Sequence, residues 1–190
     1  RERSEKMKHL FIINPAAGKE NSYDEIHAAL ESLEKPIDYE LYLTQAPGDA
    51  TAYIREYCRN YTDPVRFYAC GGDGTLNEVV NGVAGFDNVA ITTFAGGSGN
   101  DFARMFSEPD AFRDLERLLD AEEVSLDLIR CNNDYSLNIC SVGLDARIGH
   151  DVANYKRLPL LSGFRAYAVS TVVNVVKGIS EHYVVEVNGE

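Results

Sequence analysis

Short runs of apolar residues alternate along this chain with longer segments in which apolar residues recur every three or four positions. The short runs predict strands, and the periodic segments predict helices with one apolar face. Predicted strands cover His9 to Asn14, Tyr39 to Thr44, Val65 to Cys70 and Val89 to Phe94. Predicted helices cover Tyr23 to Leu33, Ala50 to Tyr61, residues 75–83, a short segment near Phe102, and Ala111 to Leu119.

This alternation is typical of an α/β protein with a doubly wound, mostly parallel sheet. In such sheets, ligands bind beyond the carboxyl ends of the strands. The glycine-rich segments of this sequence all follow predicted strands. The sequence therefore places a candidate binding site at that edge of the sheet.

The alternation ends near Val124, and three later segments predict strands. They are Val124 to Cys131, Tyr135 to Val142, and Glu181 to Asn188. We therefore expect an α/β lobe over residues 7–127 and the beginning of a β-rich C-terminal lobe over residues 128–190.

The segment Gly71-Gly-Asp-Gly-Thr-Leu-Asn-Glu78 lies between a predicted strand and a predicted helix. Its glycines let a ligand approach the main chain, and the amides that open the helix attract an anion such as phosphate. The carboxylate of Asp73 would repel phosphate unless a metal ion lay between them. A purely structural interpretation is also open, because Thr75 and Glu78 have the spacing of a helix capping box.

Three further segments occur in order around this loop: Asn14 through Gly18, Gly97 through Asp101, and Asn138 through Asp145. Together the four segments resemble the diacylglycerol kinase catalytic domain family, the bacterial lipid kinases related to sphingosine kinases. The resemblance implies a nucleotide-binding lobe followed by a β-sandwich lobe, of which this chain holds only the beginning. It also implies transfer of the γ-phosphoryl group of ATP to a lipid hydroxyl, most simply diacylglycerol giving phosphatidic acid.

Several loop residues become candidate nucleotide ligands through their position after strands or through the resemblance. They are Asn14, Pro15, Ala16, Ala17, Gly18, Thr44, Gly71, Gly72, Asp73, Gly74, Thr75, Leu76, Asn77 and Ser98. Ser98 stands where relatives usually have threonine, and either residue offers a hydroxyl. An ordinary strand-to-helix loop at residues 14–18 and a turn hydroxyl at Thr44 remain open as structural alternatives.

Three aspartates, Asp73, Asp101 and Asp127, are interpreted as each following a strand, which predicts that they converge at one edge of the sheet. Carboxylates beside a triphosphate favour Mg²⁺, which keeps several waters, so we expect these residues to hold it through water. For Asp127 a hydrogen-bonded acid at a strand end is an alternative, and Asn100 has the character of a helix cap. The remaining motif residues, Asn138 through Asp145, are expected to line the cleft.

The resemblance further implies a glutamate general base in an Asp-Gly-Glu context. Asn188-Gly189-Glu190 is similar to it but lacks the leading aspartate. We therefore leave the catalytic base unassigned and expect it beyond residue 190. Residues 1–190 are accordingly expected to be a piece of a longer protein that is inactive alone.

Composition limits the partners. The 190 residues are 45% hydrophobic and carry a net charge of −12, which argues against nucleic acid because its binding needs a basic face. No apolar run is long enough to span a bilayer, and no secretory leader is evident, so we expect a cytoplasmic protein that meets its lipid at the inner membrane surface. The four cysteines have no metal-site spacing and are expected to be reduced core thiols.

Two other functions remain open. NAD kinases are similar in the Gly71–Thr75 core, so a kinase for a soluble dinucleotide is one alternative. A non-catalytic module that binds nucleotide or lipid is the other. The sequence does not specify the oligomeric state.

Overall fold

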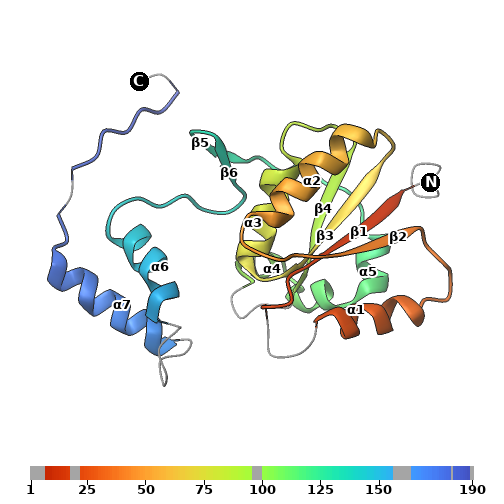
Figure 1. Ribbon diagram of the computed structural model, residues 1–190, viewed down its shortest axis with the longest axis horizontal. Coiled ribbons are helices and arrows are strands. Elements are labelled where there is room, and N and C mark those ends of the chain that lie inside the picture. The colour runs from red at the N-terminus through yellow and green to blue at the C-terminus, as the bar shows by residue number, and fades with distance from the viewer. Residues whose placement is uncertain (1–6, 18–21, 96–99, 156–163, 181, 189–190) are drawn as a thin grey trace. The chain divides into compact units, whose positions relative to one another are not determined.

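The computed structural model describes residues 7–17, 22–95, 100–155, 164–180 and 182–188. Four parallel strands form its main sheet in the order β2-β1-β3-β4 (Figure 1). Their bounds are β1 Lys8–Ile13, β2 Tyr39–Leu43, β3 Val65–Gly71 and β4 Val89–Ala95. The predicted α/β fold with a doubly wound parallel sheet is confirmed.

Helices connect and cover these strands. They are α1 Ser22–Glu31, α2 Asp49–Asn60, α3 Asp73–Val83, α4 Asp101–Arg104, η2 Pro109–Arg113 and α5 Leu115–Asp120. The sheet has a hydrophobic cluster on each face, because successive strand residues point to opposite sides. Leu10 and Ile12 of β1 pack with α2 and α3, whereas Phe11 and Ile13 pack with α1 and α5.

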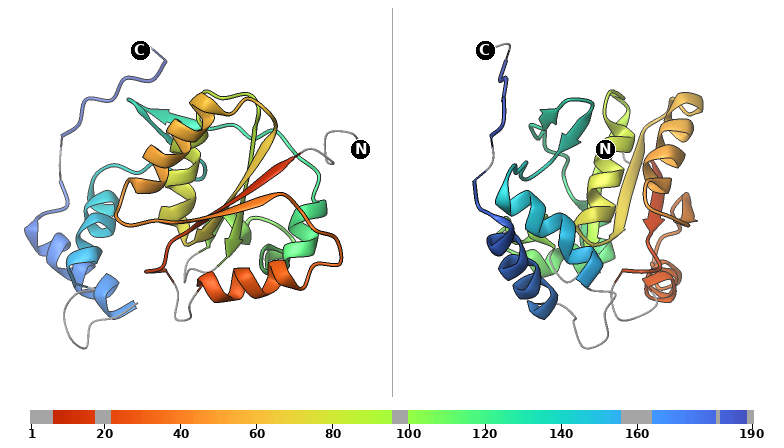
Figure 2. Two further views of the ribbon diagram at one scale, coloured as in Figure 1. Left: turned by 45° about the vertical axis from the view of Figure 1, so that its right-hand side comes forward. Right: turned by 60° about the vertical axis from the view of Figure 1, so that its left-hand side comes forward.

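Helices α2 and α3 lie side by side over one face (Figures 1 and 2). A Cβ atom added to Gly82 of α3 would lie 2.7 Å from Cβ of Ile54 in α2. This spacing is shorter than real side chains tolerate, so glycine at position 82 sets how closely the two helices approach.

A buried cation anchors α5 on the other face. The side chain of Arg66 in β3 is almost fully buried and donates to the main-chain oxygens of Leu118 (2.9 Å), Leu119 (3.2 Å) and Ala121 (3.2 Å). Its guanidinium also lies 3.4 Å from the Glu123 carboxylate. These contacts satisfy carbonyl groups at the carboxyl end of α5, where positive charge is favourable. The helix predicted over Ala111 to Leu119 is in fact divided into η2 and α5 at Asp114, which caps α5.

A short antiparallel hairpin follows, formed by β5 Ile129–Cys131 and β6 Asp134–Ser136. The two strands predicted over Val124 to Cys131 and Tyr135 to Val142 are therefore much shorter than expected. Residues 182–188, predicted as a strand, have no strand pairing. Strand formation needs a partner main chain, which the residue pattern of one segment does not specify.

Contacts within the chain divide it into two compact units, Arg1–Ile139 and Cys140–Glu190. The second unit contains α6 Leu144–Tyr155 and α7 Phe164–Lys177. The domain boundary predicted at residues 127/128 remains a prediction.

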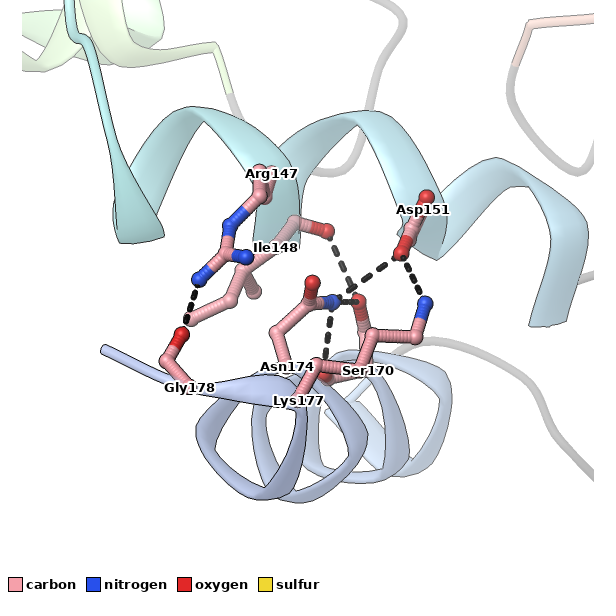
Figure 3. A network of polar contacts seen from close by, with 7 residues as sticks. All are labelled: Arg147, Ile148, Asp151, Ser170, Asn174, Lys177 and Gly178. Carbon is pink, nitrogen blue, oxygen red and sulfur yellow. Dashed lines mark hydrogen bonds and ion pairs between the residues drawn. The ribbon is translucent and has the colours of Figure 1, made fainter. Parts of the chain in front are cut away.

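Polar groups join α6 to α7 (Figure 3). Ser170 donates to the oxygen of Ile148 (2.9 Å), and Asn174 donates to the carboxylate of Asp151 (3.1 Å), which also accepts from Lys177 (3.4 Å). The hydrogen bond from Asn174 and the charge of Lys177 lower the pKa of Asp151. The buried side chains of Ser170 and Asn174 in α7 are therefore both hydrogen-bonded to α6.

The structure also tests the predictions about the cysteines and about membrane-spanning segments. Cys58 and Cys70 are buried thiols as expected, but Cys131 and Cys140 are exposed, so only half of the cysteines belong to a core. None of the helices that the structure describes is both long and apolar enough to cross a lipid bilayer.

Candidate functional site

The strand order creates a topological switch point between β1 and β3. The chain runs from β1 to β2 on one side and then returns past β1 to β3 on the other, and the helices that follow β1 and β3 lie on opposite faces of the sheet. Ligands of open α/β sheets bind at such a switch point, beyond the carboxyl ends of the strands. Asn14 follows β1 directly, and Gly72 follows β3 directly.

Asn14 joins the two loops at this point. Its main-chain amide donates to the oxygen of Cys70 (3.0 Å), and its Nδ2 donates to Oγ1 of Thr75 in α3 (3.2 Å). Its Oδ1 accepts from the amide of Ala16 (3.0 Å), which shapes the turn after β1. Asn14 therefore fixes the loop after β1 against the start of α3.

Gly71 leaves room for this contact. A Cβ atom at position 71 would lie 2.3 Å from Oγ1 and 2.8 Å from Cβ of Thr75. Only glycine lets the end of β3 pass this close to the first turn of α3. The first amides of α3 have no partner within the helix, and its dipole favours an anion near them.

The loop after β2 reaches the same edge. The amide of Thr44 donates to the oxygen of Ile13 (2.9 Å), which places Thr44 beside Asn14 across the β1–β2 pair. The carboxylate of Asp49 accepts from the amide of Gln45 (2.8 Å) and from the hydroxyl of Tyr42 (3.1 Å). These contacts give the turn between β2 and α2 a defined shape.

Asp73 connects the loop after β3 to the segment after β4. Its Oδ1 accepts from the amide of Asp101 (2.7 Å), and its Oδ2 accepts from the amide of Asn100 (3.0 Å). Asn100 lies at the N-cap of α4 in the left-handed region, with φ 55°, and its own side chain makes no cap hydrogen bond. The carboxylate of Asp73 thus takes the place of a local cap.

Only two of the three predicted metal ligands lie near each other in the structure. Asp73 and Asp101 are adjacent through the hydrogen bond just described, whereas Asp127 lies exposed in the segment without regular structure between α5 and β5. The premise that Asp127 follows a strand is therefore wrong, because the predicted strand from Val124 begins only at Ile129. Within the described residues, no three His, Cys, Asp or Glu side chains form a group that could hold a metal ion.

The other candidate ligands have mixed surroundings. Pro15, Ala16 and Ala17 lie in the turn after β1, and Gly74 in the first turn of α3 is exposed. Leu76 is buried in the core and can offer a ligand only its main chain, while Asn77 donates to the oxygen of Tyr135 (3.2 Å). Gly18 and Ser98 lie outside the described residues.

Comparison with known proteins identifies the family to which these loops belong. The family described as "Diacylglycerol kinase catalytic domain" matches residues 8–131, which include the whole parallel sheet and the loops that Asn14 and Asp73 join. This chain belongs to the diacylglycerol kinase catalytic domain family. The family resemblance inferred from the four motifs is thereby confirmed.

Relatives of this family member include proteins named as kinases. A diacylglycerol kinase from Staphylococcus aureus (strain bovine RF122 / ET3-1) is 32% identical over 162 residues, which are 84% of this chain and 50% of that protein. A solved structure of a diacylglycerol kinase from Bacillus anthracis (str. Sterne) superposes with a TM-score of 0.54 at 28% identity, covering 69% of this chain and 50% of that one. The chain spans 50–60% of the length of the curated relatives it matches.

Sequence reasoning missed two residues of this lipid kinase family member that hold the loops in place. The carboxylate of Glu78 accepts from the amides of Gly48 (2.9 Å) and Ala50 (3.2 Å), rather than closing a capping box with Thr75. The capping-box alternative is wrong because α3 begins at Asp73 and its N-cap is a glycine without a side chain.

The second missed residue, Asn81, joins the hairpin to α3. Its Oδ1 accepts from the amide of Tyr135 (2.8 Å), and its Nδ2 donates to the oxygen of the same residue (2.8 Å). The signal available in the sequence was an asparagine within an apolar stretch of a predicted helix, because a polar side chain buried there needs partners.

Proposed function

We propose that this chain forms the ATP-binding lobe of a lipid kinase that transfers the γ-phosphoryl group of ATP to a lipid hydroxyl. The observation that carries the proposal is the hydrogen bond from Asn14 to Thr75 at the switch point between β1 and β3. It brings two loops of the family motif together where α/β sheets bind ligands. Diacylglycerol is the proposed acceptor, because a relative with 32% identity is named for it.

The main chain is the proposed phosphate ligand. The loops at residues 14–17 and 71–75 offer amides, and the start of α3 adds the favourable end of a helix dipole. We propose that Thr44 and Asn77 contribute side chains, and the family resemblance adds the hydroxyl of Ser98 and the main chain of Gly18 as further ligands. In phosphoryl transfer such groups position the nucleotide and stabilise the charge that spreads over the transferred oxygens.

Asp73 suits a water-mediated magnesium site. Its exposed carboxylate uses two acceptor positions on the amides of Asn100 and Asp101, and a carboxylate has about four. The remaining lone pairs can accept from the waters that Mg²⁺ retains. Bound magnesium would neutralise charge on the ATP phosphates, and Asp101 stands beside Asp73 as a second acid.

The proposed setting is the cytoplasmic side of a membrane, where the enzyme meets its lipid without a spanning helix among the described residues. The general base is not assigned, because no Asp-Gly-Glu segment occurs in the sequence. We therefore propose that residues 1–190 bind ATP but do not phosphorylate lipid by themselves.

The test is phosphate transfer by the full-length protein from radiolabelled ATP to diacylglycerol in mixed vesicles, with NAD as a competing soluble acceptor. We expect label in lipid and none in NAD, and we expect Asp73→Ala to lose nearly all of it. Asp63→Ala, which changes an exposed acid before the opposite end of β3, is the matched control and should keep activity.

Asp73→Asn separates charge from structure, because an amide oxygen can still accept one of the two hydrogen bonds. We expect this variant to fold like the unaltered protein and to lack activity. Full turnover by a folded Asp73→Ala protein would overturn the proposed role, and label in NAD alone would overturn the choice of lipid.

A further inference from the structure

The first turn of α2 is capped by a residue from another helix. The N-cap of α2 is Gly48, whose φ is 85° and which has no side chain to cap with. Oε1 of Glu78 accepts from the amide of Gly48 (2.9 Å), and Oε2 accepts from the amide of Ala50 (3.2 Å). One carboxylate of α3 therefore supplies both the acceptors and the negative charge that the start of α2 needs.

The same residue holds α2 through its main chain. The hydroxyl of Thr51 donates to the oxygen of Glu78 (2.9 Å). The close approach at Gly82 and Ile54 continues this contact along the two helices. The position of α2 relative to α3 is thus fixed at its first turn by three hydrogen bonds to Glu78.

This attachment determines where the loop after β2 lies. Its first residue, Thr44, is tied to β1 by the hydrogen bond to Ile13, and its last residues are tied to α3 by Glu78. Between these points Asp49 folds the turn back on the amide of Gln45 (2.8 Å). The loop is therefore held at both ends, and only one of the two attachments comes from the sheet.

We propose that Glu78 is a positioning residue for the nucleotide site, which presents Thr44 to ATP by holding residues 44–50 against α3. The inference rests on the proposed function, and it assigns a role to Glu78, for which the family resemblance implies no contact with the nucleotide. Because Thr44 would contact the bound nucleotide equally before and during phosphoryl transfer, loss of Glu78 should weaken ATP binding and leave the chemical step unchanged.

The experiment measures KM for ATP and kcat of the full-length kinase with diacylglycerol vesicles. We expect Glu78→Ala to raise KM roughly 10-fold with kcat within about 2-fold of the unaltered enzyme. Glu78→Gln keeps one acceptor oxygen without the charge and should fall between the two. Glu116→Ala, an exposed glutamate in the first turn of α5, is the matched control and should change neither constant.

A second comparison tests whether Glu78 acts through Thr44. If it does, Thr44→Val and Glu78→Ala should be non-additive, and the double variant should have a KM close to that of the more impaired single variant. Multiplying effects would overturn the inference, as would a lowered melting temperature with unchanged KM. If the unaltered protein does not bind ATP, the proposed function and the inference are both overturned. If folded Glu78→Gln and Glu78→Ala proteins bind ATP as the unaltered protein does, the inference alone is overturned.

Discussion

The contact between Gly71 and Thr75 predicts opposite effects for two single-methyl substitutions at the junction of β3 and α3. In Gly71→Ala the new methyl group would lie 2.3 Å from Oγ1 and 2.8 Å from Cβ of Thr75. Thr75 is 5% exposed and belongs to the first turn of α3, so it has little room to move. In Gly74→Ala the methyl group would meet no atom within 4 Å.

The magnitudes follow from these surroundings. Overpacking by one methyl group costs about 1–3 kcal/mol, and displacing Thr75 also loses its hydrogen bond from Asn14, about 1 kcal/mol. Against this, alanine gains about 0.5–1 kcal/mol over glycine by restricting the unfolded chain. Gly71→Ala should therefore lose about 2 kcal/mol, whereas Gly74→Ala, inside a helix, should gain about 0.5–1 kcal/mol.

Thermal unfolding followed by circular dichroism measures the difference. For a protein of this size, 1 kcal/mol shifts Tm by about 2–4 °C, so Gly71→Ala should melt about 4–8 °C lower and Gly74→Ala slightly higher than the unaltered protein. Equal shifts in both variants would refute the argument, because they would show that the end of β3 has space for a side chain.

Two other predictions concern a buried arginine and a buried histidine. Arg66→Met should lower the free energy of unfolding in urea by about 2–6 kcal/mol, about 1–3 kcal/mol for each of the main-chain oxygens of Leu118 and Leu119 that loses its donor. A loss below about 1 kcal/mol would contradict the role of the guanidinium as an anchor of α5. Burial and the nearby Arg66 lower the pKa of His9 to about 4 from an ordinary value of 6.5. Between those pH values the unfolded chain binds a proton that the folded chain does not, so stability should fall by up to about 3 kcal/mol as pH drops from 6.5 to 4. His9→Gln, which can still hydrogen-bond the Tyr68 hydroxyl, should remove that slope, and an unchanged slope in urea unfolding at each pH would exclude His9 as its source.

The parallel sheet could be predicted because its signals are local. Each buried strand is a short apolar run, and each helix has one apolar stripe, so β1, β3 and α2 lie within one residue of the predicted bounds. The placement of Asn14, Thr44 and Thr75 at one edge then follows from strand direction alone. Nothing in this reasoning required knowledge of side-chain partners.

Side-chain partners were the part that sequence reasoning could not supply. Thr75 and Glu78 have capping-box spacing, but the helix starts three residues earlier than that motif requires, and Glu78 pairs with amides 30 and 28 residues away. The same limit explains Asp127, whose neighbours Val124 and Leu126 look strand-like yet have no strand pairing in the structure. A local pattern specifies which faces are apolar, and it leaves open which distant group a polar residue meets.

The segment from Gly71 to Glu78 has both a recognisable local pattern and side-chain partners that are distant in the sequence. Gly71 is required by the close approach of Thr75, Thr75 accepts from Asn14, Asp73 caps α4, and Glu78 caps α2. Each of these four positions thus has a structural partner in another part of the lobe. In the proposed nucleotide site, phosphate recognition falls chiefly to main-chain amides, so substitutions at Gly71, Thr75 and Glu78 should act on affinity by moving those amides, whereas substitutions at Asp73 should also remove the proposed magnesium site.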